Sequence, residues 1–380
     1  MFHPSSRLLR QLEPLARALN PFTSQSTATY HIGLSYASKN SPPFVSSPHP
    51  FQYGFANRQS SSGLAPKITS FIEDSLSRPA GRGELSEAAI GGWDERISLE
   101  TRKWGAGEDF FCVVDLDYAR AQYARQLHLA IADGVGGWGD TVDPSLFSQA
   151  LMYWYFRHAD RNSALHPREI LESAHQSVST DPAVPAGSAP ACAVALGGDG
   201  ILRGINMGDS GCWVLRQGEI VFSTPAGTHY FNCPKQMSKI PQNMVTGRML
   251  SDRINDDSAA DSFTASLLPG DVVVLYTDGL SDNVPSSHVS LLHKQIANLL
   301  SLPSNTLLTA EEREGEMARL FADVLVGYGR MAMARTGEEP GWKTPFEVEA
   351  LREGYKFKGG KVDDIAVITA VVGERGEGDT

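Results

Sequence analysis

The sequence lacks paired cysteines and long hydrophobic runs. Its four cysteines form no C-x-x-C motif and do not have the spacing of zinc ligands; they are Cys112, Cys192, Cys212 and Cys233. The first three lie within or beside apolar runs, which predicts small buried side chains in a reducing or neutral compartment. No apolar run approaches the ~18 residues that a membrane-spanning helix needs. We therefore expect a soluble protein without an integral membrane segment.

Acidic residues are almost absent from the first 72 positions. This part holds six Lys or Arg and one acid, Glu13, although the whole chain has 44 acidic and 33 basic residues. The net charge of −11 therefore divides into +5 for residues 1–72 and −16 for the rest. A body this acidic repels phosphate backbones, which argues against nucleic acid as a partner, and it favours bound cations.

The basic, serine-rich start is typical of an organelle transit peptide. On a helical wheel, leucines share one side and arginines the other: Leu8, Leu12, Leu15 and Leu19 against Arg7, Arg10 and Arg17. Pro14 would kink this helix, and a tail with chance clustering is the alternative. We predict a mitochondrial transit peptide at 1–40 for import into the matrix, a disordered linker at 41–72, a folded domain at 73–373 and a flexible tail at 374–380.

The folded domain shows β-type runs and helical patterns in blocks. The runs are Phe110–Val114, Leu127–Ala132, Ala191–Leu196, Ile201–Ile205, Trp213–Leu215, Val272–Tyr276 and Ile365–Val372. Helical patterns cover about Pro144–Ala159, Pro167–Val178, Pro285–Leu300 and Glu311–Ala334, and Asp143-Pro144 is a helix start signal. Because strands and helices do not alternate regularly, the order indicates an α+β fold with antiparallel sheets covered by helices.

Carboxylates recur at the ends of these runs. The run at 127–132 ends on Asp133 and a glycine-rich loop, and Asp278 ends another run beside a glycine. Glu108-Asp109 and Asp363-Asp364 precede runs, and Asp209 lies in a turn between two of them. Any one acid here is most simply a turn residue, but five such places together indicate a site. Oxygen-only ligands suit Mg²⁺ or Mn²⁺.

Five motifs, in this order, make a resemblance specific: GED (107–109), ADGVGGW (132–138), GDSG (208–211), TDGLSDN (277–283) and DDIAV (363–367). With these five motifs, the chain resembles the metal-dependent, type 2C (PPM) serine/threonine protein phosphatases over roughly residues 80–373. The stretches VDPSLFS (142–148), HYFNCPKQ (229–236) and GGKVDD (359–364) resemble the mitochondrial branch of that family. That branch is associated with metabolic proteins of the matrix, including those of ubiquinone biosynthesis, so the resemblance implies such proteins as partners.

The resemblance implies a four-layer α-β-β-α sandwich, two antiparallel sheets flanked by helices, with a dimetal Mn²⁺ or Mg²⁺ site that activates water against phosphoserine or phosphothreonine. By motif, Asp133 would bridge two metals. The Gly134 carbonyl and Glu108 would serve one, and Asp278 and Asp363 the other. Asp109 would hold water at the metals. Asp209, Asp278 and Asp282 match a weaker third metal site.

Asp364 stands where many members of the family have Asn, a mild departure, and two other departures matter more. Val135 stands where many members have a histidine that acts as general acid, so water, another residue or His229 would have to protonate the leaving group. Trp104 stands where many members have a phosphate-binding arginine, so Arg102 or Lys103 would substitute for it. No cysteine has an arginine six residues later, as the thiol phosphatases require.

Three other interpretations are open at this point. Residues 134–139 match G-x-G-x-x-G, the dinucleotide-binding pattern. Asp115 and Asp117 form the D-x-D of phosphatases that use an aspartyl nucleophile, although Ala119 departs from that motif. A catalytically weak pseudophosphatase or scaffold is the non-enzymatic alternative, and it rests on Trp104 and Val135.

Overall fold

The computed structural model describes residues 26–41, 44, 70–71, 105–114, 126–138, 142–241, 251–303 and 308–376. Its two main sheets each have five antiparallel strands, in the orders β1-β14-β13-β7-β8 and β12-β6-β5-β3-β2. These strands are β1 (Ser26–Ala37), β2 (Phe110–Val114), β3 (Leu127–Ala132), β5 (Ala191–Leu196), β6 (Ile201–Met207), β7 (Gly211–Arg216), β8 (Glu219–Ser223), β12 (Asp261–Ser266), β13 (Val272–Tyr276) and β14 (Ile365–Gly376). Short strands β4 (Gly187–Ala189), β9 (Thr228–Tyr230), β10 (Cys233–Pro234) and β11 (Met237–Lys239) form two small ladders.

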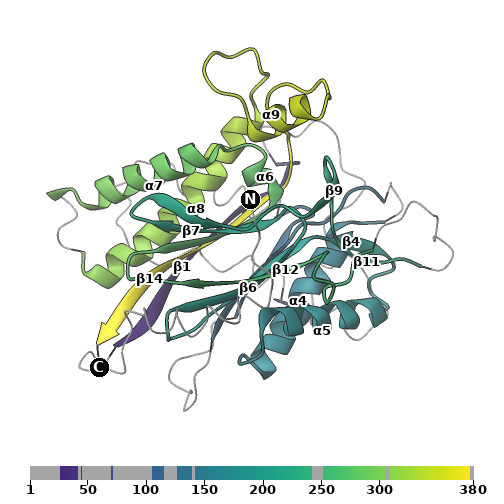
Figure 1. Cartoon of the computed structure of the whole chain (residues 1–380), viewed down its shortest axis with the longest axis horizontal. Helices are drawn as coiled ribbons and strands as arrows, with labels where there is room; N and C mark the ends of the chain where they lie inside the picture. Colours follow the sequence, from purple (N-terminus) through teal and green to yellow (C-terminus); the bar gives the residue numbers. More distant parts are fainter. Residues whose placement is uncertain are drawn as a thin grey trace.

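Helices cover the outer faces of both sheets (Figure 1). Helices α4 (Ser145–Arg161) and α5 (Pro167–Thr180) pack on the sheet that contains β2, β3, β5 and β6. Helices α7 (Ser286–Leu300) and α8 (Ala310–Met333) cover the other sheet, where α8 lies along β1 and β14. The short α6 (Asp278–Ser281) and α9 (Pro345–Arg352) lie at the edge near the start of β14. The four-layer sandwich is therefore confirmed.

Burial explains why the apolar runs form the inner strands. Every residue of β5 and of β13 is buried, as expected for strands with a neighbour on each side and a covered face. The four predicted helices match α4, α5, α7 and α8. At the start of α4, Asp143 Oδ1 accepts hydrogen bonds from the Ser145 amide at 3.1 Å and the Ser145 hydroxyl at 2.6 Å. The dinucleotide interpretation is wrong, because β3 runs antiparallel to both of its neighbours.

The predicted start of the folded domain at residue 73 is wrong. Strand β1, inside the segment assigned to a transit peptide, pairs with β14 from Ser26↔Gly376 to Ala37↔Ile365. A Cβ at Gly33 would lie 2.1 Å from the Ala318 carbonyl oxygen, so only glycine lets α8 approach the strand this closely. Residues 1–25 lie outside the described residues.

Parts of the predicted linker and tail also contact the domain. The Phe71 ring lies 5.6 Å from that of Tyr153, and the Arg330 guanidinium lies 4.6 Å from the Phe44 ring centre. Residues 374–376, assigned to the tail, belong to β14, and residues 377–380 lie outside the described residues. Within the described part of the chain, no helix has both the length and the apolar character needed to cross a membrane.

Candidate active site

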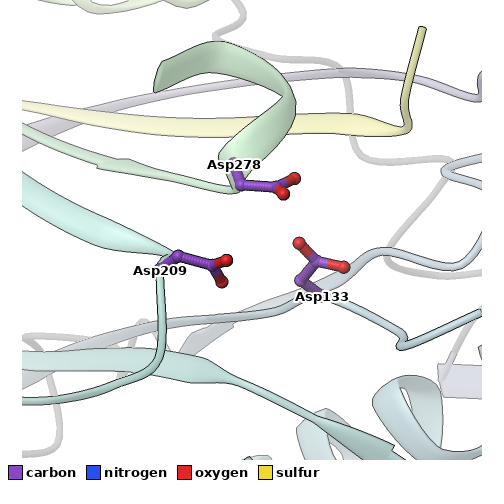
Figure 2. Close-up of side chains that lie close together, drawn as sticks. All are labelled: Asp133, Asp209 and Asp278. Carbon is purple, nitrogen blue, oxygen red and sulfur yellow. The ribbon is translucent and has the colours of Figure 1, made fainter. Parts of the chain in front are cut away.

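Three predicted metal ligands converge where the two sheets meet (Figure 2). Asp133 follows β3, Asp209 lies in the turn between β6 and β7, and Asp278 is the first residue of α6 after β13. One carboxylate oxygen from each lies within 4.8 Å of the others. Strands of both sheets therefore bring three carboxylates into one cluster, and their role as metal ligands stays a prediction.

Glu108 is held beside this cluster by its own backbone. Its amide donates to Asp364 Oδ2 at 3.0 Å, and its carbonyl accepts from the Ser148 hydroxyl of α4 at 2.5 Å. The loop after β3 passes directly against it, because a Cβ at Gly134 would lie 2.4 Å from the Glu108 carbonyl oxygen. The Gly134 backbone therefore reaches the site where a larger residue would collide.

Three buried carboxylate oxygens have no hydrogen-bonding partner among the described residues: Asp109 Oδ2, Asp209 Oδ1 and, on α8, Glu316 Oε1. Buried polar atoms are normally paired, and an unpaired anionic oxygen is especially costly. The first two atoms belong to residues that the sequence assigned to metal or to water at the metals, whereas the other oxygen of Glu316 pairs with Arg319. Hard divalent cations prefer carboxylate oxygens, so the residues present fit such a group.

Burial first, and repulsion between the carboxylates second, raise the pKa values of several acids in the cluster. Burial raises the pKa of Asp133 well above its ordinary value, and the charges of Asp278 and Asp109 raise it further. Burial also raises the pKa of Asp209, with Asp278 contributing. Burial raises the pKa of Glu108 to about 7, despite an opposing effect of Lys39. Carboxylates gathered this closely need positive charge to remain ionised together.

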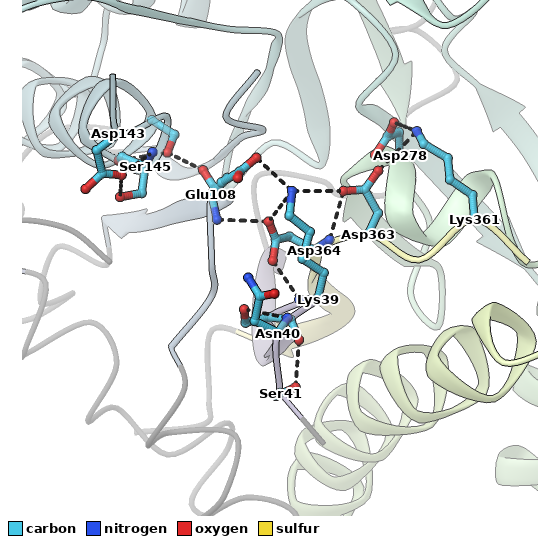
Figure 3. A network of polar contacts seen from close by, with 12 residues as sticks. Lys39, Asn40, Ser41, Glu108, Asp143, Ser145, Asp278, Lys361, Asp363 and Asp364 are labelled. Carbon is cyan, nitrogen blue, oxygen red and sulfur yellow. Dashed lines mark hydrogen bonds and ion pairs between the residues drawn. The ribbon is translucent and has the colours of Figure 1, made fainter. Parts of the chain in front are cut away.

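Lys39 supplies part of that charge from an unexpected place. It follows β1, and its Nζ lies 2.8 Å from Glu108 Oε2, 3.4 Å from Asp364 Oδ2 and 3.8 Å from Asp363 Oδ1 (Figure 3). Its amide donates to Asp364 Oδ1 at 2.7 Å. The sequence interpretation missed this residue because it placed residues 1–40 outside the domain. The alternation of Ile32, Leu34 and Tyr36 was the available strand signal.

Lys361 supplies a second charge on the opposite side. Its Nζ lies 2.6 Å from Asp278 Oδ2, 2.7 Å from Asp282 Oδ2 and 3.1 Å from Asp363 Oδ2. Burial would raise the pKa of Asp278, but the Lys361 ammonium outweighs it and the pKa is lowered. The sequence analysis quoted this lysine within GGKVDD without giving it a role.

Of the remaining predicted site residues, some lie in the described part of the chain and others do not. Asp282 faces Lys361, and Asp363 lies between both lysines. His229 Nε2 lies 3.0 Å from Asp252 Oδ2, so it has a partner of its own. Arg102 and Lys103, the predicted phosphate ligands, lie outside the described residues, as do Asp115 and Asp117.

Comparisons with known proteins identify the family. The chain is 34% identical over 306 residues to the protein phosphatase PTC7 homolog of Xenopus laevis, covering 76% of this chain and 96% of that protein. It is 32% identical over 306 residues to the human PTC7 homolog, covering 77% and 93%. The chain belongs to the PPM, or type 2C, family of protein phosphatases. No protein-family model matches it.

A solved structure of another phosphatase has the same fold. The X-ray structure of the photosystem II phosphatase PBCP aligns with a TM-score of 0.54 and 23% identity, covering 90% of this chain and 98% of that one. At this identity the likeness concerns the fold alone. Together with the two helix-covered sheets, it confirms the type 2C architecture expected from the five motifs.

Proposed function

We propose that this PPM phosphatase hydrolyses phosphoserine and phosphothreonine in proteins at a site that holds two Mn²⁺ or Mg²⁺ ions. The observation that carries the proposal is the convergence of Asp133, Asp209 and Asp278 from separate elements, with oxygens within 4.8 Å of one another. The unpaired, buried Asp209 Oδ1 and Asp109 Oδ2 add to it, because a cation would satisfy the first and water held by the cations the second.

The residues divide into two ligand groups. Asp133 would bridge the cations, with Glu108 and the Gly134 carbonyl on one side, and Asp278 and Asp363 on the other. When bound, two such cations neutralise the charge of a phosphate ester and lower the pKa of a water molecule, so that the water can lose a proton and attack the phosphorus. Asp109 Oδ2 is free to accept a hydrogen bond from that water.

Positive side chains complete the proposed phosphate site. Arg102 and Lys103 remain our predicted phosphate contacts, and Lys39 adds a partly exposed ammonium beside Glu108. Val135 has no proton to give to the leaving serine or threonine oxygen, so water or another residue must supply it. The described contact of His229 is with Asp252, which is not a proposed ligand, and it gives that histidine no direct support as the proton donor.

Phosphate release from a phosphothreonine peptide tests this function. We expect turnover by the wild type with Mn²⁺, loss of turnover with EDTA, and loss in Asp133→Asn at any Mn²⁺ concentration. Asp160→Asn is the matched control, because Asp160 is exposed on α4. Metal-independent turnover, or full activity in Asp133→Asn, would overturn the mechanism.

The same assay separates the two alternatives. A pseudophosphatase releases no phosphate even with saturating Mn²⁺. An aspartyl-nucleophile phosphatase forms a trappable phosphoaspartate and loses activity in Asp115→Asn, whereas the dimetal mechanism requires no covalent phosphoenzyme.

We also propose a mitochondrial matrix location, with phosphoproteins of mitochondrial metabolism, including ubiquinone biosynthesis, as the substrate class. The basic, amphipathic start of the chain supports this location, as does the resemblance of its motifs to the mitochondrial branch of the family. Since β1 begins at Ser26 and lies in the sheet, a cleaved transit peptide has to end before that residue. N-terminal sequencing of the protein recovered from mitochondria should therefore find a start at or before residue 26; a start beyond Ala37 would contradict it.

A further inference from the structure

The Lys361 ammonium occupies the side of the cluster that was expected to bind a weaker third metal. Two of the three residues assigned to that metal, Asp278 and Asp282, contact its Nζ at 2.6 and 2.7 Å. The third, Asp209, has a carboxylate oxygen within 4.8 Å of one on Asp278. Figure 3 shows the lysine reaching Asp278 from the segment before β14.

The backbone of Lys361 is fixed by contacts that involve none of the proposed dimetal ligands. Its amide donates to Asn283 Oδ1 at 2.9 Å, and its carbonyl accepts from Asn283 Nδ2 at 2.8 Å. Asn283 is fully buried and also donates to the Gly279 carbonyl at 2.9 Å. The main chain of Lys361 is therefore attached to α6, the helix that carries Asp278.

The ammonium itself has a partner outside the dimetal ligands. That partner is the Asp282 carboxylate. The backbone carbonyl of Asp282 in turn accepts a hydrogen bond from the Phe346 amide at 2.9 Å. The Phe346 ring lies 5.1 Å from Lys361 Nζ, so an aromatic face covers the other side of the charge. Because neither contact involves Asp278 or Asp363, neither has to break for those two residues to bind a metal.

We propose that Lys361 is a built-in cation that takes the place of a third divalent metal, so that this phosphatase binds two metals and not three. The inference rests on the proposed dimetal site. A divalent cation placed between Asp209 and Asp282 would meet the like charge of the Lys361 ammonium at a few ångströms, and that repulsion opposes its binding. Removing the lysine charge should therefore open the third position.

Metal stoichiometry tests the proposal without any activity measurement. The full chain is titrated with Mn²⁺, and bound metal is counted by native mass spectrometry and by the electron paramagnetic resonance signal of free Mn²⁺. We expect two Mn²⁺ per wild-type chain and a third in Lys361→Met, bound at least ~100-fold more tightly than any third ion of the wild type. Lys343→Met is the matched control: this exposed lysine contacts Glu347 and should leave two.

A double variant guards against a general loosening of the site. In Lys361→Met combined with Asp282→Asn, the third Mn²⁺ should be lost again while the first two remain. Three Mn²⁺ on the wild type at similar affinity, or only two on Lys361→Met, would overturn the inference and leave the dimetal site standing. A wild type that binds no Mn²⁺ would overturn the dimetal site and this inference with it.

Discussion

Removal of β1 should destabilise the whole domain, although the strand lies where a transit peptide was predicted. The comparison is between a chain that starts at Ser26 and one that starts at Ser41. The second lacks the strand that covers the edge of β14 over its whole length, and it also lacks Lys39. The first keeps every described residue.

The stability lost with β1 can be estimated from the burial of its side chains. Leu34 and Tyr36 are each 7% exposed, and burying a large apolar side chain contributes about 1.5–3 kcal/mol. Those two residues alone account for about 3–6 kcal/mol, out of a typical domain stability of about 5–15 kcal/mol. The uncovered, apolar edge of β14 would also favour aggregation.

Thermal unfolding followed by circular dichroism measures the effect. We expect the chain from Ser26 to unfold like the full-length protein, and the chain from Ser41 to unfold roughly 10 °C lower or more, or without a cooperative transition. Full-length Lys39→Met removes the charge but keeps the strand, and should unfold far closer to the wild type. Equal unfolding temperatures for the two shortened chains would refute the assignment of β1 to the domain.

Two further predictions concern stability. Gly33→Ala should lower the free energy of unfolding by about 1–3 kcal/mol, because the added Cβ would collide with the Ala318 carbonyl of α8. Gly315 also lies on α8, but a Cβ there would meet nothing nearer than 3.9 Å. Gly315→Ala should therefore raise the free energy of unfolding by about 0.5–1 kcal/mol. Denaturation in urea compares them, and a stabilising Gly33→Ala would contradict the packing described. Burial lowers the pKa of His128 from 6.5 to about 4. Between these two pH values the unfolded chain takes up a proton that the folded protein refuses, so stability falls by about 3 kcal/mol as pH drops. His128→Gln should flatten this part of the stability–pH curve, and an unchanged slope would count against it.

Three carboxylates that the sequence proposed as metal ligands come together in the structure, and each lies close to the end of a strand. Asp133 and Asp278 follow apolar runs that could be recognised locally, and the order of five motifs identified the family. The structure adds that Asp133, Asp209 and Asp278 meet. Local patterns cannot give such a meeting, because it depends on how two sheets face each other.

The two lysines escaped prediction for a related reason. Lys39 pairs with Glu108, 69 residues away, and its backbone bonds to Asp364, 325 residues away. No helix or strand period connects such positions. Lys361 lies near Asp363 in sequence, but its contact with Asp282 depends on the way α6 meets the segment before β14. The composition of the first 72 residues was also misleading, since one stretch holds both a basic leader and a strand of the sheet.

The most direct test of the central claim is an anomalous difference map from crystals soaked in Mn²⁺. The account predicts two peaks in contact with Asp133, one beside Glu108 and the Gly134 carbonyl and the other beside Asp278 and Asp363, with no peak at Asp282. An absence of peaks at these carboxylates, or metal bound away from Asp133, would contradict it.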